Sequence, residues 1–218
     1  MPLALCTMLG VNGCSSEDPA PAPEPKAVES PTESSGPPGT AVSGNTPCDL
    51  LTDTELSALA GEPLPEGTPA NVGGLPACQW GPTERVGVQA TTVPAGTWAR
   101  QLPALVDRLE ASGLLDAENR DKLEAARELV ESGAQIAPDR ACDLFTSLIV
   151  EFQGQPSGSW RVINAVPTRE DPRAISGQSC RQGTFTSVLL VAPGLSGSDD
   201  EIERVATALA TARKRGLD

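Results

Sequence analysis

The sequence contains no histidine, no tyrosine and only three lysines among its 218 residues. Histidine is the commonest general base and the commonest metal ligand, so its absence argues against most hydrolases and metalloenzymes. A serine hydrolase would then need lysine as its base, and neither Lys26, Lys122 nor Lys214 lies in a Ser-x-x-Lys motif. The chain also lacks a phosphate-binding loop, a Gly-x-Gly-x-x-Gly motif and a calcium-binding loop. We therefore predict no enzymatic activity, no cofactor and no metal site.

Positive charge is also scarce. The chain has 16 lysine and arginine residues against 29 aspartate and glutamate residues, which gives a net charge of −13. Acidic residues outnumber basic ones both before and after Cys48. Nucleic acids and anionic lipid headgroups bind to basic patches, so the composition argues against both as partners.

The apolar start of the chain is too short to cross a bilayer. Residues Pro2–Gly13 form a stretch of twelve, which is typical of the hydrophobic part of a signal peptide. It is followed by Cys14, and Val11, Gly13 and Cys14 together resemble the bacterial lipobox. This resemblance implies cleavage before Cys14 and attachment of a diacylglycerol to its thiol, and two acyl chains give stable membrane attachment. We predict that residues 1–13 are a signal peptide and that the protein is anchored on the extracytoplasmic face of the cell membrane.

The segment after Cys14 cannot form a core. Between Ser15 and Pro47, 17 of 33 residues are proline, glycine or serine, and only Val28 and Val42 are large and apolar. This composition predicts a disordered tether over residues 14–47. The remaining residues, 48–218, are enough for one domain with a substantial core.

Four cysteines remain after removal of Cys6 with the signal peptide and lipidation of Cys14. An even number in an oxidising compartment predicts two disulfides. Three pairings are possible, and we favour the pairs closest in sequence, namely Cys48 with Cys78 and Cys142 with Cys180. A metal site is not favoured, because the chain has no Cys-x-x-Cys motif and no histidine.

The first half of the domain is predicted to contain three helices and two strands. Thr52 and Glu55 form a capping box for a helix that ends near Gly61. A Gly/Pro-rich loop, Pro63–Pro76, then leads into a strand at residues 78–80, and residues 85–93 alternate as a second strand. Two helical patterns follow. The first consists of Trp98, Leu102, Leu105 and Leu109, and Pro103 predicts a kink or a later start in it. The second lies between Asp116 and Gly133 and consists of Leu123, Ala126, Leu129 and Val130.

The second half is predicted to contain strands and a closing helix. One strand is expected to carry Leu144, Leu148, Val150 and Phe152 on one face, and another covers residues 160–166. A third, residues 184–191, is apolar on both faces and is expected near the centre of the sheet. The last helix begins at Asp199 and presents Ile202, Val205, Ala206, Leu209 and Ala212 to the core. This order predicts an α+β fold, with helices packed on one face of a largely antiparallel sheet.

Several of these features occur together in one known family. The lipobox, the tether, the segment Pro47-Cys48-Asp49-Leu50-Leu51-Thr52 and the later Cys78-Gln79-Trp80 resemble an actinobacterial lipoprotein family of unknown function. The resemblance covers residues 14–80. It implies a location at the cell envelope and a fold class, and it assigns no activity.

The function favoured by the sequence is non-catalytic binding or scaffolding at the cell envelope. Candidate contacts for an envelope protein or a cell-wall component are Trp98, Trp160 and the loop Pro63–Pro76, although packing in the core is the common role of a tryptophan. One alternative is an accessory subunit that docks on a membrane protein. A less favoured alternative is a cell-wall hydrolase that uses two of the many carboxylates.

Overall fold

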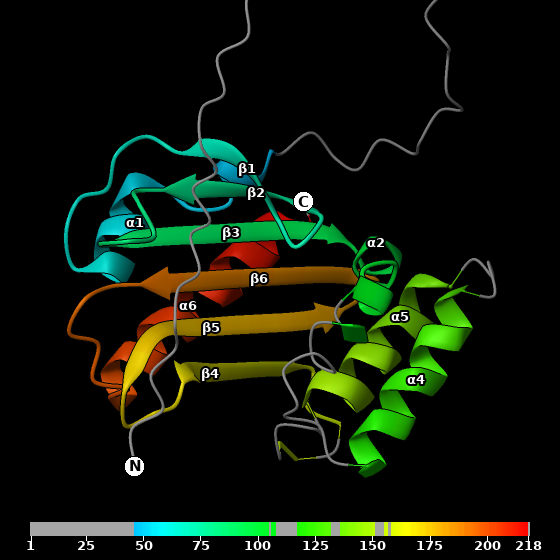
Figure 1. Ribbon diagram of the computed structural model, residues 1–218. Coiled ribbons are helices and arrows are strands. Elements are labelled where there is room, and N and C mark those ends of the chain that lie inside the picture. Colours follow the sequence, from blue (N-terminus) through cyan, green and yellow to red (C-terminus); the bar gives the residue numbers. More distant parts are fainter. Residues whose placement is uncertain are drawn as a thin grey trace, which may run out of the picture. The chain divides into compact units, whose positions relative to one another are not determined.

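The computed structural model describes residues 46–104, 106–107, 117–131, 136–150, 155–156 and 158–217. The predicted signal peptide, Cys14 and nearly all of the predicted tether lie outside these residues. The described part forms one six-stranded sheet in which every neighbouring pair of strands is antiparallel, in the order β1-β2-β3-β6-β5-β4 (Figure 1). The predicted α+β class with an antiparallel sheet is confirmed.

The strands account for most of the predicted β segments and add two. Their bounds are Thr68–Val72 (β1), Leu75–Trp80 (β2), Gly87–Pro94 (β3), Arg161–Pro167 (β4), Pro172–Arg181 (β5) and Thr184–Val191 (β6). β6 lies between β3 and β5, so its predicted central position is confirmed. β1 lies inside the segment predicted to be a loop, where its edge position tolerates Pro69. β5 was not predicted.

The helices begin with a short 3₁₀ turn and end with the longest helix. Their bounds are Pro47–Asp49 (η1), Asp53–Ala60 (α1), Ala95–Ala99 (α2), Ala117–Glu131 (α4), Pro138–Phe145 (α5), the π-helical turn Thr146–Val150 (η2) and Asp199–Arg215 (α6). The predicted capping box of α1 is present, with Thr52 as the N-cap and Glu55 as its partner. After α2 the chain turns, and helical structure resumes at Leu102, directly before Pro103. Leu105, Leu109, Asp116 and Gly133 lie outside the described residues.

The predicted strand through Leu144 and Leu148 is wrong, because this segment is helical. Pro138 occupies the first turn of α5, where a proline costs no hydrogen bond. Ala141, Phe145 and Leu148 are buried, and their spacing of four and three residues matches a helix. Phe152 lies outside the described residues.

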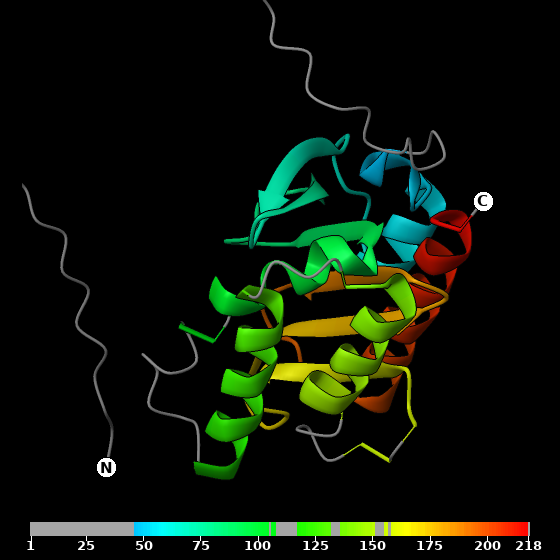
Figure 2. The ribbon, with the colours of Figure 1, turned by 90° about the vertical axis from the view of Figure 1, so that its right-hand side faces the viewer.

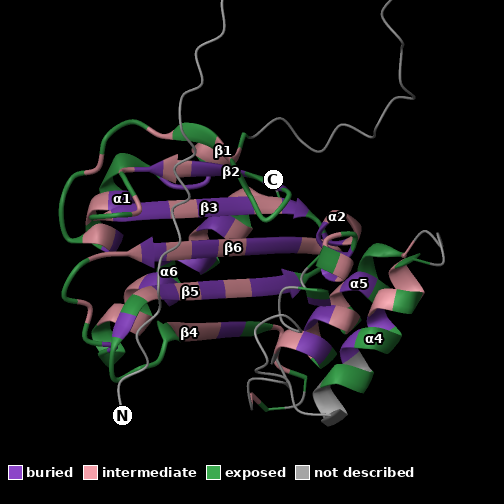
Figure 3. Ribbon diagram, in the orientation of Figure 1, coloured by how far each residue is buried: buried purple, intermediate pink, exposed green. Residues whose placement is uncertain are grey.

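Helices α1 and α6 cover one face of the sheet over its central strands. α6 packs on β5 and β6, and α1 packs on α6. Val188 and Leu190 point from β6 into this core, where they meet Leu209 of α6 and are almost completely buried. Buried residues are concentrated in β3, β6 and β5 (Figure 3).

Helices also cover one end of the opposite face, so they are not confined to one face of the sheet as the sequence predicted. Phe185 points to this side because side chains alternate along β6, and it contacts Trp98 of α2 and Phe145 of α5. Figure 2 shows α4 and α6 on opposite sides of the strands. An ion pair between Asp107 and Arg127, 3.0 Å long, joins the helical segment after α2 to α4.

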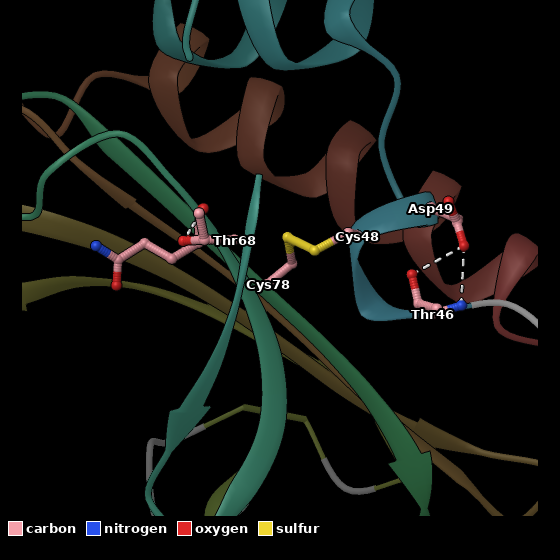
Figure 4. Close-up of a disulfide and its surroundings, with 6 residues drawn as sticks. Thr46, Cys48, Asp49, Thr68 and Cys78 are labelled. Carbon is pink, nitrogen blue, oxygen red and sulfur yellow. Dashed lines mark hydrogen bonds between the residues drawn. A yellow bond between two sulfur atoms is a disulfide. The ribbon is translucent and has the colours of Figure 1, made fainter. Parts of the chain in front are cut away.

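Each disulfide links one helical layer to the sheet. Both favoured pairs are present: Cys48–Cys78 joins η1 to β2, and Cys142–Cys180 joins α5 to β5. The first lies beside a small cap in which Thr46 donates its backbone N–H and its hydroxyl to Asp49 (Figure 4). The closed loops span 30 and 38 residues. In the chain-entropy model, such loops stabilise the fold by about 4 kcal/mol each.

Glu55 and Arg215 connect the two ends of the domain. The Arg215 guanidinium donates to both Glu55 carboxylate oxygens, at 2.5 and 2.9 Å, and to the carbonyl of Leu50 at 2.9 Å. The hydrogen bonds that Glu55 accepts from Arg215, with those from Thr52, lower the pKa of Glu55 from 4.5 to about 2. A carboxylate whose pKa is lower in the folded state stabilises the protein above its unfolded pKa. This contribution is lost as the pH falls from about 4.5 to about 2.

Replacing Glu55 with Gln should therefore flatten the acid dependence of stability. We expect E55Q to lower the free energy of unfolding at pH 7 by about 1 to 2 kcal/mol, because the pair is partly exposed to solvent. The difference in free energy of unfolding between E55Q and the wild type should shrink as the pH falls from about 4.5 to about 2. Urea unfolding at several pH values measures this, and Glu84→Gln, an exposed carboxylate outside the pair, is the control. An unchanged gap between E55Q and wild type at low pH would contradict the assignment.

Candidate functional site

The uncovered part of the sheet presents rows of small, polar and apolar side chains. Cross-strand pairing places Thr91, Ser187 and Gln178 in one row. The next row runs through Gln79, Gln89, Leu189 and Ser176. Apart from the buried Thr91, these side chains are half-buried, although they lie on central strands. The row before them, Val93, Phe185 and Cys180, is buried under α2 and α5. The helices therefore cover the row that contains Phe185 and leave the next row, which contains Ser187, largely open.

A groove of about 240 Å³ lies at this boundary. Its floor comes from β2, β3, β6 and β5, and its walls come from α2 with the residues that follow it and from the turn between β1 and β2. The lining residues are Val72, Gly73, Leu75, Ala77, Gln89, Ala90, Thr91, Trp98, Gln101, Leu102, Ser176, Gln178, Phe185, Ser187 and Leu189.

The helical wall of the groove is fixed by an aromatic cluster. The Trp98 ring stacks on Phe185 with centroids 5.4 Å apart, and it meets Phe145 edge-on at 5.5 Å. Trp98 is only 6% exposed. Its main role is therefore packing, while part of its surface contributes to the wall. Such aromatic pairs stabilise a fold beyond the area that they bury, so they help to hold this wall in place.

The opposite wall is the turn between β1 and β2. The side-chain oxygen of Asn71 accepts a hydrogen bond from the backbone N–H of Gly74, at 3.0 Å, which closes the turn. The amide of Gln101 lies so close to Gly74 that a methyl group there would be 2.2 Å from the Gln101 oxygen. The turn and the residues after α2 therefore meet and close one end of the groove.

The floor offers hydrogen-bonding groups that the protein only partly uses. Gln89 donates to Gln79 at 3.1 Å, and Gln178 donates to the Ser176 hydroxyl at 3.4 Å. Within the described part of the chain, no side-chain hydrogen bond is made by Ser187 or Gln101. Amide and hydroxyl groups can both donate and accept. The groove can therefore bind a ligand through hydrogen bonds as well as apolar contact.

Among the described residues that line the groove, none is charged. A general acid, a general base and a carboxylate pair are thus absent from this set of residues. The described ranges also contain no group of three or more cysteine, aspartate or glutamate side chains arranged to hold a metal ion. The described lining therefore offers hydrogen-bonding groups and apolar contact without a charged side chain.

Two of the three sequence candidates meet at this groove. Trp98 contributes to one wall, and the segment Pro63–Pro76 supplies the turn of the other. Trp160 lies elsewhere, beside Arg213 of α6. The sequence reasoning missed Gln89, Gln178 and Ser187. Their only sequence signal is a polar residue at alternate positions of a strand, which does not distinguish a groove from an ordinary solvent-exposed face.

The sequence matches one family profile over residues 9–158, described as "Protein of unknown function (DUF3558)". The chain belongs to this family. The predicted membership of a family of unknown function is confirmed, and the DUF3558 match includes both walls of the groove but not β5 and β6. No curated protein matches the chain, and no solved structure matches it. Within the described residues of this DUF3558 protein, no helix has the length and apolarity needed to span a membrane.

The turn between β5 and β6 positions the helical wall, and Gly183 is its critical residue. Gly183 has a φ of 72°, its carbonyl accepts the N–H of Ala95 at 2.7 Å, and an added methyl group would lie 2.6 Å from Cβ of Pro138. Gly194 has a similar φ of 76° with no atom within 4 Å of the added methyl group.

Gly183→Ala should therefore destabilise the protein more than Gly194→Ala. The positive φ costs each variant about 1 to 2 kcal/mol. The contact with Pro138 should add about 1 to 3 kcal/mol for Gly183→Ala alone. Thermal unfolding of the two variants measures the difference. Equal melting temperatures would show that this turn does not hold the starts of α2 and α5.

Proposed function

We propose that this DUF3558 protein is an exported lipoprotein whose domain binds an uncharged ligand without chemically changing it. The observation that carries the proposal is the groove, whose described lining combines amides, hydroxyls and apolar side chains and has no charge in a strongly acidic protein. Concave, mainly apolar sites with a few polar groups are typical of ligand binding.

Ligand binding is favoured over docking on a membrane protein. A docking module would present a broad apolar patch. The exposed large apolar side chains in the described ranges are Val72, Val166 and Leu217, which are scattered over different elements. Only the first of them belongs to the groove. A paired-carboxylate hydrolase is disfavoured in turn by the neutral lining.

Two features support export and anchoring. Val11, Gly13 and Cys14 have the lipobox pattern, and the family match begins at residue 9, so it includes them. The two disulfides are the kind of cross-link that persists in an oxidising compartment. The lipid on Cys14 would hold the domain at the outer face of the cell membrane.

Filling the groove should weaken the binding of a neutral probe. Nile red, an uncharged dye that brightens in apolar sites, should bind the disulfide-intact protein saturably. Ser187→Phe places a ring over the floor and should weaken binding at least about tenfold, or 1.4 kcal/mol. Thr54→Phe adds the same ring to the exposed surface of α1 and should leave the affinity unchanged. Equal affinities for wild type and S187F would overturn the assignment of the site.

Removing the predicted lipid acceptor should release the protein from the membrane. Cys14→Ala should move the protein from the membrane fraction to the soluble fraction of the native host. Cys6→Ala, in the predicted signal peptide, should leave it in the membrane. Intact mass of the wild type should correspond to a chain that begins at Cys14 and carries a diacylglycerol. An unmodified chain that retains residues 1–13 would exclude the anchor.

A further inference from the structure

Three arginines surround the ring of Trp160, on the side of the sheet opposite the groove. The guanidinium carbons of Arg161, Arg181 and Arg213 lie 5.7, 5.4 and 5.0 Å from the ring centroid. They come from the start of β4, the end of β5 and the last turn of α6. Each distance lies within the range of a cation–π contact. The fold therefore brings three positive charges from distant parts of the sequence to one aromatic ring.

Within the described part of the chain, none of these three arginines makes an ion pair of 4 Å or less. The described ion pairs involve Arg127, Arg169 and Arg215 instead. Beside the cluster, Arg161 lines a shallow depression with Glu203 and Lys214, and no ion pair of 4 Å or less joins Arg161 to Glu203. Like charges at close range repel one another. Although the chain has 29 acidic residues, no described carboxylate is ion-paired with this cluster.

One buried polar atom without a hydrogen-bond partner belongs to the cluster, and another belongs to the strand residue paired with Arg161. Among the described residues, the buried side-chain nitrogen and oxygen atoms that lack a hydrogen bond are Nε of Arg213 and Oγ of Ser179. Ser179 is the cross-strand partner of Arg161, so it belongs to the same face of the sheet. Buried polar groups normally have partners. Both unsatisfied groups can donate to an oxygen atom.

We propose that the Trp160 cluster, formed by Trp160, Arg161, Arg181 and Arg213, binds a phosphate group. Guanidinium groups donate two parallel hydrogen bonds to phosphate oxygens and are less strongly hydrated than ammonium groups. A phosphate ester offers several oxygens and one or two negative charges, which suits several guanidinium groups that converge on one ring. The phosphate belongs either to a lipid headgroup or to a soluble phosphate ester. The site does not depend on binding in the groove.

The test uses the full chain with Cys14→Ala, so that its own lipid does not attach it to vesicles. Glycerol phosphate is titrated by calorimetry at constant ionic strength, and it should bind saturably. Arg181→Gln removes an exposed guanidinium and should weaken binding about tenfold, as expected for the loss of a charge-assisted hydrogen bond. Arg181→Lys keeps the charge but loses the planar guanidinium. Its affinity should therefore lie between that of the parent chain and that of R181Q. Arg85→Gln, an exposed arginine in the loop before β3, should bind like the parent chain.

Vesicles distinguish the two sources of phosphate. Sedimentation with phosphatidylglycerol vesicles that glycerol phosphate reverses would assign the site to lipid headgroups. Glycerol phosphate binding without sedimentation would assign it to a soluble ester. The proposal is overturned if neither probe binds saturably, or if R85Q weakens binding as much as R181Q, since the effect would then be one of overall charge.

Discussion

The strand β6 sets the architecture of this protein, because it lies at the centre of the sheet and needs cover on both faces. Val188 and Leu190 are covered by α6, and Phe185 is covered by α2 and α5. Beyond Phe185 no described helix covers the second face, and the side chains there change to Ser187 and the half-buried Leu189. The groove follows directly from this incomplete cover. Its position is therefore fixed by the same packing that holds the domain together.

The predictable parts of the fold were those governed by local chemistry. The capping box of Thr52 and Glu55 fixed the start of α1, and the apolar stripe of α6 fixed its buried side. The proximity of the cysteines in sequence favoured the correct two disulfides. Three segments could not be predicted in this way. β1 owes its pairing to β2 despite its proline, β5 alternates small and polar residues, and α5 has a spacing of apolar residues that also suits a strand.

The candidate site could be predicted only in part, for a related reason. Trp98 and the segment Pro63–Pro76 were identified because aromatic residues and Gly/Pro loops are conspicuous. Gln89, Gln178 and Ser187 were not, because half-buried polar residues on a strand resemble an ordinary solvent face until the sheet order is known. Trp160 was identified as a candidate, but its arginine neighbours come together only through the register of β4 and β5 and the packing of α6.

Net charge alone also does not predict which ligands this protein can bind. A charge of −13 argues against anionic partners on average, yet three arginines converge on one ring and the groove lining in the described residues is neutral. Local arrangement, rather than composition, decides which ligands each surface can accept. The acidic residues for which burial is described lie largely on exposed helix and loop positions, where they favour solubility. The described groove lining is thus neutral, whereas the cluster of arginines around Trp160 is cationic.

Native mass spectrometry of the protein extracted from its own membranes tests the central claim most directly. The wild-type protein should retain a bound molecule in addition to its covalent lipid. The Ser187→Phe variant, extracted in the same way, should lack that molecule while keeping the lipid. The same bound mass in both proteins, or no bound mass in the wild type, would contradict the account of the groove as a ligand site.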